Sequence, residues 1–208
     1  MIGRRWPRGI ATCLTAVLLL VWSVTSVATI MVSRPYTRAA VKTVMPGLAA
    51  GRLAAIDEVV AYAGSGGSGR LSFLTLKERN HMGDVANVFA NARVAAGMLW
   101  VLAAIVSVVY LVTGRWRQVL KLLKWAVVIA EVVLAALLIV SIVDFDWLFS
   151  KFHRLFFPQG NWLFSPGSKL ITLFPERFWL LSTEVLVTGT VILLAVVGAA
   201  AHYGSRRL

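Results

Sequence analysis

The sequence is poor in cysteine and in charged residues. Cys13 is the single cysteine among 208 residues, so an internal disulfide is impossible and a metal site built from several cysteines is excluded. Charged residues make up 14% of the chain, against about 25% in ordinary soluble domains. Hydrophobic residues make up 59%. This composition indicates a protein that lies in a membrane.

Acidic residues are scarcer still. Nine Asp and Glu stand against 21 Lys and Arg, which gives a net charge of +12. A basic surplus can indicate nucleic-acid binding, but here the basic residues lie at the ends of apolar runs. Basic residues in such places contact anionic lipid and set the orientation of membrane spans. We therefore expect membrane lipid, and no nucleic acid, as a partner.

Four apolar runs are long enough to cross a bilayer, which takes about 20 residues. They are residues 10–32, 94–113, 125–143 and 182–201. The first run exceeds the ~7–15 apolar residues of a cleaved signal peptide, so we interpret it as an uncleaved anchor. The sequence thus predicts an all-α membrane protein, with residues 1–208 forming one membrane domain.

Charge density predicts the orientation of the spans. The short segments 1–9, 114–124 and 202–208 contain nine Lys and Arg and no acidic residue, whereas the large loops 33–93 and 144–181 contain twelve basic and seven acidic residues. By the positive-inside rule the short segments face the cytoplasm. Both termini are therefore expected inside the cell and both large loops outside.

Amphipathic segments occur in the first large loop. Residues 48–61 have apolar side chains at helical spacing, and from Lys77 onward a polar stripe and an apolar stripe recur together. The second pattern predicts a helix at the membrane surface that continues into the second span. Residues 64–69, rich in glycine and serine, are expected to form a flexible tether.

Two histidines, His81 and His153, lie in the two large loops. An imidazole is suited to general acid–base chemistry near neutral pH. Glu78 and Asp84 stand three residues before and after His81, so on a helix either carboxylate could orient its ring. Taken alone, His153 lies among aromatic residues in the sequence, so a packing role is the alternative to a catalytic role. These residues lack the dense ligand spacing of zinc sites, so we expect neither a metal nor another cofactor.

The second large loop is rich in aromatic residues. Trp and Tyr collect at membrane interfaces in any membrane protein, so interface anchoring is one interpretation. Phenylalanine dominates here, however, and lacks the polar tip that favours the interface. Trp147, Phe149, Phe152 and Phe156 could place an amphipathic segment in the outer leaflet. The candidate lining of a substrate or lipid pocket is Phe152, Phe156, Phe157, Trp162, Phe174 and Trp179.

Three segments together resemble the bacterial lipoprotein intramolecular transacylase family, called Lit. They are ERNHMGDV at residues 78–85, FHRLFF at residues 152–157, and WLF at residues 162–164 leading to LITLFPERFW at residues 170–179. The resemblance covers residues 70–182 well, and the remaining chain only through its span layout. Each segment is weak alone, but their order on a four-span frame is fairly specific.

The resemblance implies an acyltransferase of the bacterial inner membrane. Its substrate would be a diacylated lipoprotein, whose N-terminal cysteine carries diacylglycerol on sulfur. The enzyme would move the sn-2 acyl chain to the free α-amino group and leave a lyso-form lipoprotein. His81 and His153 match the family's two functional histidines, which would act on the outer leaflet without a cofactor.

One departure from the family concerns the loop before Leu170. Where an acidic residue is expected, residues 165–169 read SPGSK. The role of orienting a histidine would then be vacant, or it would fall to Glu78, Asp84 or Glu176. Stabilisation of the oxyanion would fall to Arg79, Arg154 or the second histidine.

The sequence is also compatible with two other functions. A non-catalytic membrane protein could use the same outer loops as a docking surface. An acyltransferase or hydrolase acting between lipid molecules could use the same histidines. Substitution of the histidines separates the first alternative from catalysis, and release of free fatty acid or need for a second lipid identifies the other.

Overall fold

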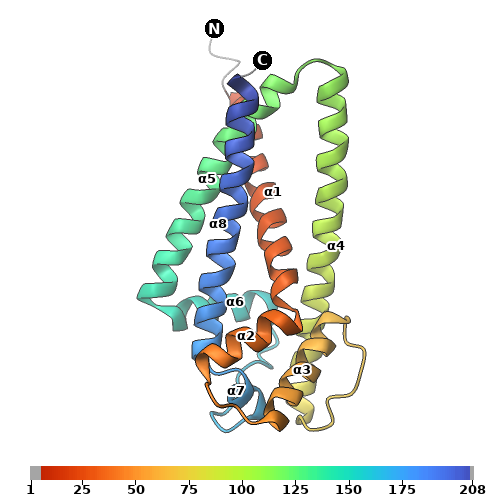
Figure 1. Cartoon of the computed structure of the whole chain (residues 1–208), viewed down its shortest axis with the longest axis vertical. Coiled ribbons are helices and arrows are strands. Elements are labelled where there is room, and N and C mark those ends of the chain that lie inside the picture. The colour runs from red at the N-terminus through yellow and green to blue at the C-terminus, as the bar shows by residue number, and fades with distance from the viewer. Residues whose placement is uncertain (1–5, 207–208) are drawn as a thin grey trace. The chain divides into compact units, whose positions relative to one another are not determined.

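The computed structural model describes residues 6–206, in which eight helices and no strand occur. In chain order they are α1 (Trp6–Met31), α2 (Arg34–Val44), α3 (Ala50–Gly64), α4 (Leu76–Val112), α5 (Trp116–Val143), α6 (Phe145–Phe156), α7 (Lys169–Leu173) and α8 (Glu176–Arg206) (Figure 1). The all-α prediction is confirmed. Arg4 and Arg5 of the predicted basic head, and Arg207 of the tail, lie outside the described residues.

Four helices, α1, α4, α5 and α8, are long and apolar enough to cross a membrane. Each predicted run falls on one of them, except that α1 and α4 end one residue earlier than predicted. A short turn joins α4 to α5. Gly114 in this turn has φ +64°, the left-handed conformation that glycine adopts at little cost after a helix.

Helix α4 is longer than a membrane span. Its 37 residues extend about 55 Å at ~1.5 Å per residue, well beyond a hydrocarbon core of about 30 Å. Its charged residues all precede Val94; they are Lys77, Glu78, Arg79, Asp84 and Arg93. Residues 94–112 of this helix contain no charged side chain. The helix predicted from Lys77 onward does continue into the second apolar run, and the bounds of the span in the membrane stay a prediction.

Contacts within the chain group its residues into two compact units. The first, here called the span unit, comprises the described residues of Met1–Val27, Val94–Leu138 and Val187–Leu208. Its buried apolar core is Val127, Ala130, Leu134, Val187 and Leu194. A Cβ atom added at Gly198 would lie 3.1 Å from Val127, so glycine lets α8 approach α5 closely, as small residues do between membrane helices. The single domain predicted for residues 1–208 stays a prediction.

The second unit, here called the loop unit, comprises Ala28–Arg93 and Ile139–Leu186. It contains α2, α3, α6 and α7, together with the first part of α4. Its buried core is drawn from several of these elements and includes Val41, Ile56, Met82, Leu173 and Phe178. The larger core of the molecule thus lies in the segments that were predicted as loops.

Local sequence signals fix the short helices of the loop unit. Ser33, Asp144 and Ser168 precede α2, α6 and α7, and each side chain accepts a hydrogen bond from a backbone N–H in the first turn. Arg38 of α2 donates to both carboxylate oxygens of Asp57 in α3. These caps and this ion pair set how the short helices begin and how α2 lies on α3.

The predicted tether at residues 64–69 forms a closed turn. Three of its glycines have positive φ values: Gly66 at +76°, Gly67 at +92° and Gly69 at +125°. The N–H of Gly67 donates to the carbonyl of Tyr62 at 2.9 Å, and the Ser65 hydroxyl donates to the same carbonyl at 3.1 Å. Glycine is required here because the turn needs left-handed backbone at successive positions.

Candidate active site

His81 and His153 lie together in the loop unit. His81 is in the second turn of α4, and His153 is in the last turn of α6. Their ring centroids are 6.1 Å apart, with an angle of 28° between the ring planes. Both side chains are buried, with exposed fractions of 7% and 9%. The two large loops, which charge density predicts to lie on one side of the membrane, thus come together at these histidines.

Aromatic rings surround the histidine pair. They belong to Phe149, Phe152, Phe157, Trp162 and Phe164. Phe157 contacts both histidines, at centroid distances of 4.8 Å from His81 and 5.6 Å from His153. Such walls exclude water and strengthen electrostatic interactions inside the pocket.

A backbone hydrogen bond determines the tautomer of His153. Its Nδ1 lies 2.9 Å from the carbonyl oxygen of Phe149, one helical turn earlier in α6. Since a carbonyl oxygen only accepts, Nδ1 must carry the proton, and in the neutral ring the lone pair is on Nε2. Burial lowers the pKa of His153, and this hydrogen bond opposes the effect only in part. The neutral imidazole is therefore favoured.

Burial has a stronger effect on His81. Burial first, and then the nearby His153, lower the pKa of His81 to about 4, although a hydrogen bond with Asn161 and the charge of Asp84 act in the opposite direction. At neutral pH His81 is therefore uncharged. Its Nδ1 atom is buried and has no hydrogen-bond partner within residues 6–206.

Asp84 acts on His81 through Asn161. One carboxylate oxygen of Asp84, Oδ2, accepts hydrogen bonds from Gln159 Nε2 and from Asn161 Nδ2, both at 2.6 Å. Because the amide nitrogen of Asn161 faces Asp84, its oxygen is the atom left to accept a hydrogen bond from a ring N–H of His81. Sequence reasoning missed Asn161 and Gln159, which lie in an irregular turn more than seventy residues from Asp84.

Glu78 holds the chain in place and contacts neither histidine directly. Its Oε2 accepts from the backbone N–H and the hydroxyl of Thr75, both at 2.8 Å. Its Oε1 accepts from the N–H of Leu170 at 3.0 Å. Burial alone would raise the pKa of Glu78, but hydrogen bonds from Thr75, Leu170 and Lys169 hold it below its ordinary value. Thr75 and Glu78 form a capping box at the start of α4.

Two further hydrogen bonds, one from Lys77 and one from Lys169, join the start of α4 to the segment before α7. Lys77 donates to the carbonyl of Leu163, and Lys169 donates to the carbonyl of Phe73. Together with the bond from Leu170 to Glu78, these contacts hold residues 163–170 against the start of α4. Phe164, which contacts His81 at a centroid distance of 5.5 Å, is fixed by this arrangement.

The model of the family described as "Lipoprotein intramolecular transacylase Lit" matches residues 10–179. The chain belongs to the Lit family. A comparison with curated protein sequences finds no match.

Solved structures of a Lit protein share the fold of this chain. The membrane-integral lipoprotein intramolecular transacylase Lit from Bacillus cereus superposes with a TM-score of 0.73 at 19% identity, covering 97% of this chain and 98% of that one. Two variants of that protein, each with one histidine replaced, give TM-scores of 0.72 and 0.69 at 16% and 17% identity. They cover 96% and 95% of this chain, and 92% and 95% of theirs. Membership of the Lit family makes the chain a multi-pass membrane enzyme, an acyltransferase.

The remaining polar candidates in this Lit protein lie away from the histidine pair. Arg79 donates to the carbonyl of Leu74 at 2.5 Å. Arg154 and Glu176 are exposed, and neither makes a hydrogen bond or ion pair with another part of the described chain. Within residues 6–206 no group of three or more His, Cys, Asp or Glu side chains is placed to hold a metal ion.

The predicted aromatic lining is divided between the pocket and the core. Phe152, Phe157 and Trp162 contact the histidines, as described above. Phe156 packs on Phe152 at 4.8 Å and is exposed on its other side. Phe174 belongs to the buried core, and Trp179 donates from Nε1 to its carbonyl at 3.0 Å.

Proposed function

We propose that this Lit protein moves the sn-2 acyl chain of an S-diacylglyceryl lipoprotein to the α-amino group of the same N-terminal cysteine. The observation that carries the proposal is the pair of neutral, stacked histidines in an aromatic pocket. The pocket contains basic lone pairs and apolar surface, which suit proton transfer beside an acyl chain.

The proton balance explains why two histidines are needed. The substrate amine has an ordinary pKa of about 7.7–8.0, so at neutral pH it is mostly an ammonium. Two protons leave this nitrogen before it becomes an amide. One is released to solvent, and the other goes to the glycerol oxygen that leaves. Ester-to-amide transfer is downhill, so no nucleotide is consumed.

The two histidines have different environments, and this suggests different roles. His153 has its lone pair on Nε2, so its neutral form accepts a proton there and cannot donate one. We assign to it the first proton, taken from the ammonium. His81 faces Asn161 and the charge of Asp84, which favour its protonated form. It takes the second proton from the tetrahedral intermediate and passes it to the leaving glycerol oxygen.

His81, once protonated, also stabilises the oxyanion. The imidazolium forms next to the negative charge that develops on the carbonyl oxygen, in a pocket shielded from water. Arg79 is held by the Leu74 carbonyl, and Arg154 is exposed. The geometry therefore supports His81 for this role over either arginine.

Holding the amine and the ester close together supplies the rest of the rate enhancement. Amine and ester belong to one molecule, so the enzyme needs only to bend the substrate and hold it. Holding reacting groups in register contributes up to about 7–11 kcal/mol to lowering the barrier. The rings of Phe149, Phe157 and Trp162 provide the apolar surface for the acyl chain. The basic segments at the other ends of the spans favour an outer-face location for this site.

Substitution of each histidine tests the proposal. His81→Asn and His153→Asn are expressed in a bacterial host that makes only diacylated lipoproteins, and lipoprotein N-terminal peptides are analysed by mass spectrometry. We expect lyso-form product to fall about 10²–10⁴-fold in each variant. His202→Asn, near the end of α8, is the matched control.

Persistence of the lyso form at normal levels in either pocket variant would remove that histidine from the mechanism. If the lyso form is equally abundant with the unchanged protein, with either variant and without the protein, the loops act as a docking surface. Release of free fatty acid, or transfer only when a second lipid is supplied, would identify a reaction between molecules.

A further inference from the structure

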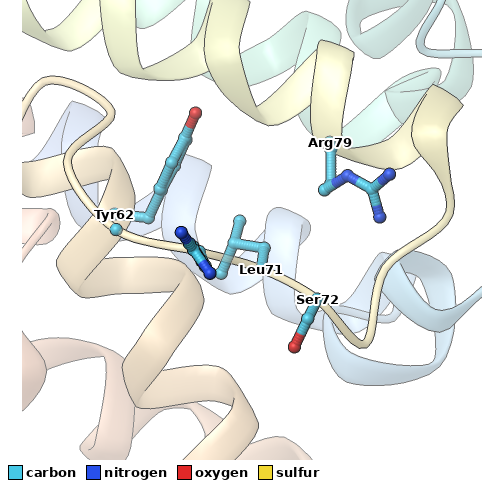
Figure 2. A pocket seen from close by; sticks show the side chains of 6 residues that line it. Tyr62, Leu71, Ser72 and Arg79 are labelled. Carbon is cyan, nitrogen blue, oxygen red and sulfur yellow. The ribbon is translucent and has the colours of Figure 1, made fainter.

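The loop unit contains a cavity that is separate from the histidine pair. Its volume is about 420 Å³, and its lining is Tyr62, Gly69, Arg70, Leu71, Ser72 and Arg79. Neither histidine lines it, and no acidic side chain does. Figure 2 shows Arg79 extending from α4 and Tyr62 rising from α3 on two sides of the space beside Leu71 and Ser72.

The closed glycine turn forms one wall of this cavity. A Cβ atom added at Gly67 would lie 3.4 Å from the Tyr62 hydroxyl, and one added at Gly83 would lie 3.8 Å from it. Gly83 follows Arg79 by four residues on α4, so the two are on the same face of the helix. The Tyr62 hydroxyl and the Arg79 side chain therefore lie along the same face of α4, and both residues line the cavity.

The lining of this cavity contains two positive charges and no negative charge. Within residues 6–206 the one ion pair found is that of Arg38 with Asp57, so neither Arg70 nor Arg79 has a carboxylate partner. Arg79 is oriented by its hydrogen bond to the Leu74 carbonyl, and this bond uses only one of its five N–H donors. Two guanidinium groups and two hydroxyls around a cavity provide the donors that a carboxylate or phosphate requires.

The cavity lies across α4 from the histidine pair. Arg79 and His81 are two residues apart, which is about 200° around a helix of 3.6 residues per turn. In the proposed function the lipid part of the substrate lies beside the aromatic rings around the histidines, but a lipoprotein also has a polypeptide that begins at the reacting amine. About five extended residues span ~17 Å, enough to pass around a helix ~10–12 Å wide.

We propose that the cavity of Arg70 and Arg79 binds a carboxylate side chain in the first residues of the lipoprotein polypeptide. This inference rests on the proposed function, because it takes the substrate to be a lipoprotein modified at its N-terminus. A lipid phosphate is less suited, since it would bring acyl chains with it. The exposed residues of the lining, Gly69, Arg70 and Ser72, have no apolar side chain that would cover those acyl chains.

Matched diacylated lipopeptides test the proposal with purified, full-length protein in detergent micelles. One peptide has two aspartates among the five residues after the modified cysteine, and the other has two asparagines at the same positions. We expect the aspartate peptide to have a KM about tenfold lower. Arg70→Gln should bring the ratio of the two KM values to about one, and Arg70→Glu should make a matched lysine peptide the preferred substrate. Arg177→Gln, an exposed arginine of the same unit, should keep the original ratio.

Three results would overturn the proposal. Equal KM values for the two peptides with the unchanged protein would show that no carboxylate is recognised. If the Arg70→Gln variant still prefers the aspartate peptide, the carboxylate is recognised elsewhere in the protein. A dependence on phosphatidylglycerol in the micelles, lost in Arg70→Gln and indifferent to the peptide, would identify a lipid phosphate as the ligand.

Failure of the proposed function has a different signature. If neither lipopeptide is converted to the lyso form, the proposed reaction is wrong. The binding of the same fluorescently labelled peptides, measured by anisotropy, would then still decide whether the cavity takes a carboxylate.

Discussion

The span unit and the loop unit differ in where their apolar side chains lie. In the span unit large apolar residues such as Leu102, Ile105 and Val132 are exposed, at 44%, 56% and 65%, and few are buried between helices. In the loop unit apolar residues from several short elements are buried together. The first arrangement suits contact with lipid tails, and the second suits a surface in water.

The same contrast holds for polar residues. Glu78, His81 and His153 are all buried in the loop unit, where each has a defined environment. Hydrophobicity therefore shows where the chain crosses the membrane, while the chemistry is determined by hydrogen bonds between distant segments. Substitutions in the two units should differ accordingly.

The strongest expected effect in stability is that of Glu78→Ala. The change leaves the buried N–H of Leu170 and the partly buried N–H of Thr75 without their acceptor, and a buried group that loses its partner costs about 1–3 kcal/mol. We expect a clear fall in the thermal midpoint of the purified protein and loss of lyso-form product. Glu58→Ala, at an exposed position of α3, is the control. An unchanged midpoint would show that α7 does not depend on Glu78.

Asn161→Ala should have a smaller, chemical effect. Without Asn161, Asp84 can no longer act on His81 through a hydrogen bond, so His81 is less well oriented and its protonated form is less stable. We expect kcat to fall about tenfold, which is ~1.4 kcal/mol, with little change in KM or thermal midpoint. Asn91→Ala, exposed on α4, should match the unchanged protein. A change confined to KM would assign Asn161 to substrate binding instead.

The histidine pair should also respond to pH in a characteristic way. Its pKa values are lowered by burial, that of His81 to about 4, whereas an unfolded histidine has about 6.5. The unfolded chain therefore takes up protons first, so stability should be full above pH 6.5 and decrease as the pH falls toward 4. Imidazole NMR signals, assigned with His81→Gln and His153→Gln, measure both values. A His81 signal that titrates near 6.5 would contradict its burial.

The smallest expected effect belongs to the span unit. Ile105→Val removes one methylene from a side chain that is mostly exposed, and either residue can face lipid. We expect activity within twofold and an unchanged thermal midpoint. A large loss of either would mean that this face of α4 contacts protein, and the contrast between the two units would need revision.

The sequence predicted the spans well because an apolar run in lipid has few alternatives to a helix. The positive-inside rule also predicted that the loops of His81 and His153 lie on one side of the membrane, and the resemblance of segments 78–85 and 152–157 to one family singled out these two histidines. The capping box of Thr75 and Glu78 could have been recognised in the sequence as the start of a helix, but the prediction did not use it. Glu78 was instead expected to orient a histidine.

The role of Asn161 could not be predicted in the same way. Its hydrogen bond to Asp84 joins residues far apart in the chain. The sequence around either residue contains no motif that predicts this hydrogen bond. The conformation of the glycine-rich turn could not be predicted for a related reason. Composition alone suggests flexibility, whereas the conformation of residues 64–69 depends on the Tyr62 carbonyl.

The exposed tip at residues 165–167 has a practical consequence. The carbonyl of Leu163 and the N–H of Leu170 are both held by α4, so the chain leaves and returns at fixed points. A short epitope inserted between Pro166 and Gly167 should therefore leave the neighbouring side chains undisturbed. Its accessibility to antibody on intact spheroplasts, against permeabilised ones, would report directly which side of the bilayer this loop occupies.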